Sequence, residues 1–179
     1  MDELNQERIE HMIEYSKTLI GAPYRWWIFD PTARTMDYNG SPFYVDRFYS
    51  IEYVMSNGTN CAGLINLMAR KAGAEPRGGT LMWIASNIKN LRPFDVTNID
   101  EYQIGTLLIR SYRTETDQGH LAVYVGDGQI IHAYPNSSEI SDDLTGPGVT
   151  LESIDESINW TVEPYYDFVV DPQHWLQKV

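Results

Sequence analysis

The chain has 179 residues, of which 25 are acidic and 13 basic, so its formal net charge is −12. This charge argues against nucleic acid as a partner, because a phosphate backbone repels such a surface. No apolar run approaches the roughly 18 residues that a membrane span needs. The length is typical of one domain that buries about 70% of its unfolded surface, so we expect a single domain over residues 1–179.

The start of the chain is charged and has no apolar signal-peptide core. Localisation therefore stays open. The protein could remain in the cytoplasm of its producer, or leave it with a phage or virion or through a dedicated secretion route. The oligomeric state also stays open.

Cys61 is the only cysteine. A single cysteine cannot form an internal disulfide or a four-cysteine zinc site, and no HExxH-type spacing supports another metal site. We therefore predict no metal and no cofactor. A lone cysteine is most often a small buried apolar residue, so its surroundings must decide its role.

Helical periodicity dominates the first half of the chain. Residues 3–20 predict a helix whose apolar face holds Ile9, Met12, Ile13, Leu19 and Ile20. Residues 24–58 are irregular and rich in Pro, Gly and aromatic side chains. A second helix is expected over Asn60–Ala72, and a third from Thr80, with Leu81, Ile84, Ile88 and Leu91 at helical intervals.

Strand patterns follow in the second half. Thr106–Tyr112, His120–Val125 and Gln129–Tyr134 are rich in β-branched, Leu and Tyr residues, and Trp160–Val170 predicts one or two strands more. Helices followed by strands with short turns indicate an α+β fold, in which helices cover one face of an antiparallel sheet.

Two of the four histidines lie in the hairpin GHLAVYVGDGQIIHAY, residues 119–134. A three-residue Gly126-Asp127-Gly128 loop would make His120 and His132 diagonal neighbours on one sheet face. A two-residue Asp127-Gly128 loop would place them on opposite faces, because a shift by one residue turns every side chain over. The sequence does not choose between the two loops.

Cys61 lies in the stretch NGTNCAGL, where Asn60 is a good helix N-cap. The cysteine then occupies the first helical turn, where free N–H groups and the helix dipole favour a thiolate, so we expect a lowered thiol pKa. A thiol there that faces a histidine on a neighbouring strand is the arrangement of a cysteine hydrolase. The second histidine would orient the first, and the Cys61 N–H would form part of an oxyanion hole.

These segments together resemble the NlpC-type family of papain-like cysteine peptidases. NCAGLINLMARKAG resembles the family's DCSG-like helix start, and GHLAVYVGDGQIIHA its GHVGIY-like and IHA-like strands. GAPYRWW at 21–27 and IGTLLIR at 104–110 resemble two further family motifs. The four matches occur in family order and cover most of residues 17–135.

The resemblance implies a papain-like fold and a catalytic set of Cys61 as nucleophile, His120 as general base and His132 as the orienting residue. It also implies an oxyanion and substrate-binding region formed by Tyr24, Trp26, Asn60, Ala62 and Gly119. The expected reaction is cleavage of an amide bond in a peptidoglycan-type or γ-glutamyl peptide, through a thioester and without a cofactor.

Departures from the family leave the substrate less defined than the reaction. Asn60 and Ala62 replace the usual Asp and Ser, and Trp27 stands where a glycine is usual. An aromatic-rich insertion at about 25–58 is either an extra packed layer or a lid that narrows substrate choice.

Two alternatives stay open: a related acyltransferase or deamidase acting on another amide or lipid, and a catalytically silent binding module. Other polar and aromatic residues have structural interpretations. His11 is expected on the surface, His174 in a terminal loop, and Trp83, Trp160 and Trp175 in packing. The acidic cluster is expected to be solvated surface; its members are Asp142, Asp143, Glu152, Asp155 and Glu156.

Overall fold

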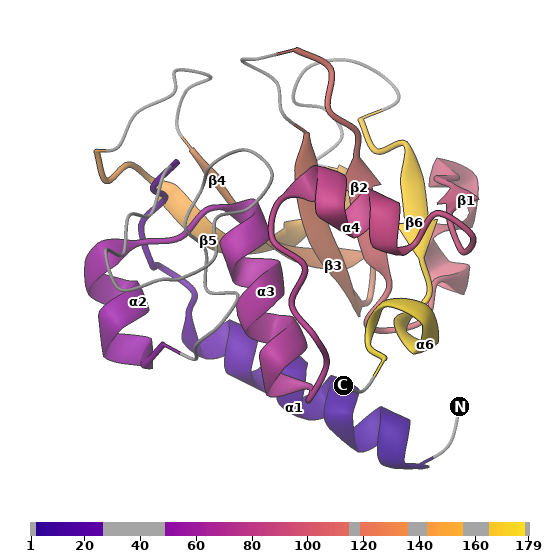
Figure 1. Cartoon of the computed structure of the whole chain (residues 1–179), viewed down its shortest axis with the longest axis horizontal. Helices are drawn as coiled ribbons and strands as arrows, with labels where there is room; N and C mark the ends of the chain where they lie inside the picture. The colour runs from indigo at the N-terminus through magenta and orange to yellow at the C-terminus, as the bar shows by residue number, and fades with distance from the viewer. Residues whose placement is uncertain (1–2, 27–48, 115–118, 136–142, 156–164, 178–179) are drawn as a thin grey trace.

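The structure of the protein is a computed structural model that describes residues 3–26, 49–114, 119–135, 143–155 and 165–177. Helical elements dominate its first half (Figure 1), namely α1 (Glu3–Thr18), α2 (Ile51–Asn57), α3 (Cys61–Lys71), α4 (Thr80–Ser86) and the 3-10 helix η1 (Val96–Glu101), with α6 (Pro172–Trp175) near the end. The strands are β1 (Arg92–Pro93), β2 (Leu107–Arg110), β3 (His120–Gly126), β4 (Gln129–Pro135), β5 (Pro147–Ser153) and β6 (Phe168–Val170).

The six strands form one sheet in the order β1-β6-β2-β3-β4-β5, and every neighbouring pair is antiparallel. The hairpin strands β3 and β4 therefore lie inside the sheet rather than at its edge. The predicted α+β class and antiparallel sheet are confirmed.

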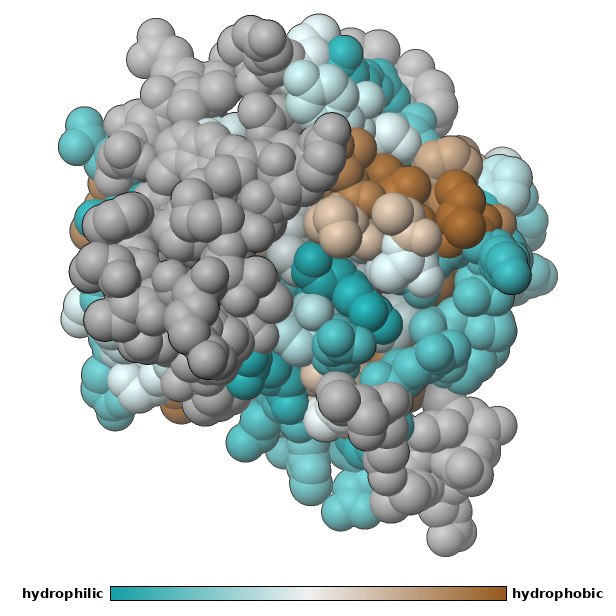
Figure 2. Space-filling view, in the orientation of Figure 1, coloured by the Kyte–Doolittle hydropathy of each residue, from teal (hydrophilic) through white to brown (hydrophobic). Residues whose placement is uncertain are grey.

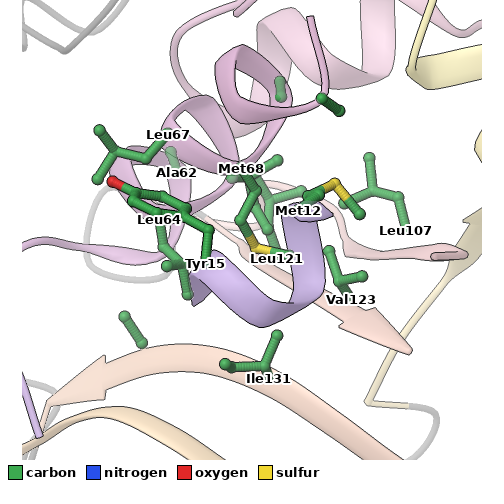
Figure 3. Close-up of a cluster of buried hydrophobic side chains, with 14 of the residues drawn as sticks. Met12, Tyr15, Ala62, Leu64, Leu67, Met68, Leu107, Leu121, Val123 and Ile131 are labelled. Atoms are coloured by element: carbon green, nitrogen blue, oxygen red, sulfur yellow. The ribbon is translucent and has the colours of Figure 1, made fainter. Parts of the chain in front are cut away.

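One face of the sheet packs against α1 and α3 (Figure 3). Residues one apart on a strand point to opposite faces, and Leu121 and Val123 of β3 share a buried cluster with Met12 of α1 and Met68 of α3. Burying a side chain of this size contributes about 1.5–3 kcal/mol to folding. This cluster fixes the start of α3 against β3.

The opposite face is also covered. Ala122 and Tyr124 of β3 belong to a second buried cluster, together with Tyr165 and Tyr166 of the segment before β6. Tyr166 is fully buried, and its ring packs edge-on against Phe94 with centroids 5.5 Å apart. Aromatic side chains thus enclose the face that carries the hairpin histidines.

Up to residue 71, the helices differ from the expectation in two places. The first helix ends at Thr18, so Ile20 lies beyond it and is 42% exposed. Residues 51–57, which the sequence analysis placed in an irregular region, form α2, with the Ser50 side chain as N-cap. The second helix is confirmed, with Asn60 as its cap.

The third helix starts at Thr80 as expected, but its fully buried positions are not the expected ones, although Ile84 packs against the core from a partly buried position. α4 ends at Ser86, and Thr80, Trp83 and the following Asn87 are its buried positions, whereas Ile88 is 63% exposed. The large indole of Trp83 takes the inward position and packs edge-on against Trp175 at 5.6 Å. Apolar side chains therefore gather on the surface over α4 (Figure 2).

The strand predictions are confirmed for β2, β3, β4 and β6, but the short β1 and the longer β5 were not foreseen. Residues 147–153 combine Pro and Gly with a short Val-Thr-Leu stretch, which is a weak strand signal alone. β5 forms because β4 offers it a full ladder from Gln129↔Ser153 to Pro135↔Pro147.

Most of the expected insertion, residues 27–48, lies outside the described residues, and so does Trp160. Within the described part of the insertion, the Tyr49 and Tyr53 rings pack with centroids 4.7 Å apart. The domain boundaries and the role of the insertion stay predictions. In the described ranges, no helix combines the length and the apolar character required to cross a membrane.

Candidate active site

The α3 N-terminus presents Cys61, and the predicted cap holds it there. The Oδ1 of Asn60 accepts a hydrogen bond from the Gly63 N–H at 2.8 Å, and its Nδ2 donates to the Trp26 carbonyl at 2.6 Å. An aspartate could accept the first bond but could not donate the second. The amide of Asn60 therefore ties the start of α3 to the 21–26 segment.

The Cys61 thiol is more enclosed than expected. Burial raises its pKa to about 11, although hydrogen bonds from the backbone of Leu121, Ala62 and Cys61 and from the Thr80 side chain favour the thiolate. The predicted lowering of the thiol pKa is therefore wrong for the resting protein, because desolvation outweighs the helix start. The thiol is neutral at neutral pH.

The Cys61 sulfur contacts the part of β3 that is not paired with β4. Their ladder includes Val123↔Ile131 and Tyr124↔Ile130 but has no pair between His120–Ala122 and β4. The backbone of Tyr124 bonds toward the β2 side, to Thr106 and Gly105, and alternation turns the Leu121 N–H toward β4. That N–H is thus available to the Cys61 sulfur.

The hairpin combines features of both predicted loops. Asp127 and Gly128 form a two-residue turn, both with positive φ, and Gly126 pairs with Gln129. A bulge between Tyr124 and Gly126 then restores the register in which Val123 opposes Ile131. The two histidines therefore share one sheet face, as the longer loop predicted.

The histidines form the centre of a hydrogen-bonded chain. His120 Nε2 lies 2.7 Å from His132 Nδ1, and His132 Nε2 lies 2.6 Å from Glu152 Oε1. Both imidazoles are buried, and the Glu152 side chain is only 13% exposed. The chain therefore runs across β3, β4 and β5 with little contact with water.

The surroundings of His120 disfavour its charged form. Burial, the neighbouring His132 and the Arg110 guanidinium hold the His120 pKa well below its usual value. Arg110 is the cross-strand partner of His120 on β2 and donates to the Tyr165 carbonyl at 3.1 Å. The Tyr165 ring packs against His120, with centroids 6.0 Å apart. His120 is consequently a neutral imidazole at rest.

Cys61 and His120 are linked through their neighbours. The Thr80 side chain bonds to Cys61, and its Cγ2 would lie 3.0 Å from a Cβ at Gly119, the residue before His120. Leu121, the residue after His120, donates its N–H to the sulfur. Among the described residues, no hydrogen bond joins the sulfur directly to His120.

The other predicted site residues surround this junction. Tyr24 is buried, and its pKa is raised well above its usual value by burial and by the nearby Cys61 and Tyr165. The Ala62 methyl faces the core, so only its backbone can contribute. Trp26 is half-buried and contributes its carbonyl to the Asn60 cap.

Glu152 is the residue that sequence reasoning misplaced. It was expected in a solvated acidic cluster, but it bonds to buried His132 from β5, a strand that was not predicted. Asp143 and Asp155 are exposed as expected, and Asp142 and Glu156 lie outside the described residues. Alternation in VTLES, once recognised as a strand, would have placed Glu152 beside the histidine face.

The remaining singled-out residues lie away from the junction. His11 is exposed on α1, whereas His174 lies on α6 rather than in a loop. Trp83 and Trp175 are buried packing residues, as predicted. Over the described ranges, no group of three or more His, Cys, Asp or Glu side chains has the arrangement of a metal site.

Comparison with solved structures identifies the architecture. The chain superposes on NlpC2 from Trichomonas vaginalis with a TM-score of 0.54 and 18% identity, covering 94% of this chain and 46% of the other. For the peptidoglycan hydrolase RipB from Mycobacterium tuberculosis, the TM-score is 0.51 and the identity 17%, covering 94% and 66%. This chain has the NlpC/P60 fold.

A Bacillus cereus NlpC/P60 family protein is similar at a TM-score of 0.50 and 17% identity, covering 94% of this chain and 40% of the other. The chain thus spans between 40% and 66% of the length of these three proteins. No family profile matches its sequence, and no curated protein does. The NlpC/P60 likeness is therefore one of fold.

Proposed function

We propose that this protein is a cysteine peptidase or amidase that cleaves an amide bond in a peptidoglycan-type or γ-glutamyl peptide. The observation that carries the proposal is the buried His120–His132 pair, whose ring nitrogens lie 2.7 Å apart. The pair lies next to the part of β3 that is not paired with β4, where the Leu121 N–H bonds to the Cys61 sulfur. The comparison adds support, because the similar RipB is named a peptidoglycan hydrolase.

His120 has the free ring atom that the reaction requires. Its Nε2 is engaged with His132, so Nδ1 is the atom left to accept a proton. The Cys61 sulfur would give its proton to Nδ1 as it attacks the substrate carbonyl carbon. The tetrahedral intermediate would then collapse to a thioester while Nδ1–H protonates the leaving amine.

The second half of the reaction reverses the role of His120. The imidazole would take a proton from water, whose oxygen attacks the thioester carbonyl. The carboxylic acid leaves, and the sulfur recovers its proton. Because both groups are neutral at rest, proton transfer would accompany the attack rather than precede it.

Backbone N–H groups near the sulfur are placed to stabilise the developing oxyanion. The Cys61 and Ala62 backbone groups already point at the sulfur, and they belong to the free N–H groups of the α3 start. Tyr24 lies close enough to Cys61 for their charges to interact, so its hydroxyl is a candidate second donor.

The direct test is hydrolysis of defined muropeptides, with products identified by mass spectrometry. The native protein should release a new amine and carboxylate pair, whereas Cys61→Ala and Cys61→Ser should lose about 1,000-fold or more in rate. Both variants should keep the native circular dichroism spectrum. Equal product from native protein and Cys61→Ala would remove the nucleophile assignment.

The same substitution at two different histidines provides a matched control. His120→Gln should lose activity nearly as strongly as the cysteine variants, because the thiol then has no base. His11→Gln changes an exposed histidine on α1 and should retain native activity. Equal activity of the two histidine variants would exclude His120 as the general base.

A further inference from the structure

We infer that Glu152 is a positioning residue that sets the tautomer of both histidines and thereby leaves the Nδ1 lone pair of His120 free. This inference rests on the proposed function, because it concerns the group that would accept the thiol proton. Glu152 lies on β5 at the far end of the hydrogen-bonded chain; it bonds to His132, and over the described ranges its side chain has no hydrogen bond to the sulfur or to His120.

The carboxylate sets the direction of each bond when both imidazoles are neutral. A carboxylate can only accept, so the 2.6 Å contact requires a proton on His132 Nε2. With His132 in its neutral form, the imidazole has one N–H, so His132 Nδ1 then accepts. The 2.7 Å contact therefore requires a proton on His120 Nε2, and His120 Nδ1 carries none.

The strand register holds the carboxylate in this position. On the β4–β5 ladder Ile130 opposes Glu152 and His132 opposes Thr150, so Glu152 and His132 are diagonal neighbours on one face. The Glu152 side chain is 13% exposed and the His132 side chain 1% exposed. Water thus has little access to replace either group as the partner of the other.

Other polar and aromatic groups also face His120. Arg110 is its cross-strand partner on β2, and a guanidinium can only donate, so it could bond only to a ring nitrogen that carries no proton. Tyr165 and Tyr166 contact the imidazole through their rings, with centroids 6.0 and 6.4 Å from its own. In the hydrogen-bonded chain from His120 through His132 to Glu152, the carboxylate is the one group that can only accept, so we assign the order of the protons to Glu152.

The discriminating substitution is Glu152→Gln, which keeps the shape of the side chain but removes its charge and supplies an N–H donor. The new amide can donate through its nitrogen as well as accept through its oxygen, so the native order of the protons is no longer fixed. Donation to His132 Nε2 reverses both bonds and places a proton on His120 Nδ1. The substitution would thereby block the ring atom that the thiol proton needs.

The direct measurement is ¹⁵N NMR of protein labelled at its four histidines, because the imidazole nitrogen shifts report which ring atom is protonated. The native spectrum should show Nε2–H tautomers for His120 and His132, assigned by substitution of each. Glu152→Gln should shift both toward Nδ1–H. A native His120 that carries its proton on Nδ1 would overturn the inference without any Glu152 variant.

Steady-state kinetics supply the second measurement. Glu152→Gln should lower kcat by about 100-fold, which is less than the roughly 10⁴-fold loss for a triad carboxylate that contacts the catalytic histidine directly, because Glu152 acts through His132. KM should change less than about twofold, since Glu152 does not line the thiol. Glu152→Asp, which keeps the carboxylate, should recover part of kcat and the native tautomers.

The matched control is Asp155→Asn, which removes the same charge from an exposed position just after β5 and should leave kcat and tautomers unchanged. If Glu152→Gln keeps native tautomers and kcat while Cys61→Ala is inactive, this inference fails and the proposed function stands. If Cys61→Ala remains active, the proposed function fails, and the NMR still decides the role of Glu152.

Discussion

At the residue scale, Cys61 shows how two opposing effects on one atom are resolved. The helix start and several N–H groups favour a thiolate, yet burial raises the thiol pKa to about 11. In the free protein Cys61 is therefore a thiol. In the proposed reaction, its reactivity at neutral pH would depend on transfer of the thiol proton to His120 when a substrate is present.

We predict from this pKa that alkylation of Cys61 by iodoacetamide is slow at neutral pH. Because the thiolate reacts and the thiol does not, the rate should rise about tenfold per pH unit from about pH 8 to pH 10. Glutathione is the control, since its rate should level off above about pH 9. The measurement is mass spectrometry of the single cysteine; a rate that is already at its plateau at neutral pH would show a stabilised thiolate instead.

At the element scale, the entry to β3 depends on Gly119. Its φ is +92°, and an added Cβ would lie 2.3 Å from the Arg110 carbonyl oxygen and 3.0 Å from Thr80 Cγ2. Neither the β2 backbone nor the threonine next to the sulfur can move without shifting the site. A side chain at this position would therefore push β3 away from Cys61.

We predict that Gly119→Ala lowers the free energy of unfolding by about 3 kcal/mol or more, from strain and overlap together. Gly128→Ala is the matched control, because Gly128 also has positive φ but no atom within 4 Å of its added Cβ. It should lose only about 1 kcal/mol. Urea denaturation measures both, and equal losses would contradict the clash at Gly119.

The same element shows which parts of the site can be predicted from sequence. Local signals sufficed for the α3 cap and for placing His120 and His132 on strands, because capping and alternation act within a few residues. The choice of loop could not be made, since the bulge after Tyr124 depends on how β3 pairs with β4. Fold class needed only the order of these patterns.

Longer-range contacts account for what was missed. β5 has a weak signal of its own and is formed by its ladder with β4, so the role of Glu152 was hidden with it. The thiol pKa was predicted with the wrong sign because desolvation depends on tertiary packing around the sulfur, and here it outweighs the hydrogen bonds from Leu121 and Thr80 that favour the thiolate. Local sequence contains no measure of that burial.

At the scale of the whole molecule, the buried histidine pair makes stability depend on pH. The folded-state pKa of His120 lies well below its usual value of 6.5. The unfolded chain therefore takes up a proton at a pH where the folded protein does not. The stabilisation is fully present above about pH 6.5 and is lost as the pH falls toward the folded-state pKa.

We predict that between about pH 7.5 and pH 5.5 the free energy of unfolding falls by about 1.4 kcal/mol more for the native protein than for His120→Gln. This is the contribution over that range of one histidine that takes up a proton only in the unfolded chain. His11→Gln, an exposed control, should follow the native curve. Acid also reduces the self-repulsion of a chain with net charge −12, but this effect is common to all three proteins and cancels in the difference. Urea denaturation at the two pH values measures the change in the free energy of unfolding of each protein. Parallel pH dependence of native protein and His120→Gln would mean that the imidazole is solvated or protonated in the fold, and the neutral base assigned to the thiol would then be lost.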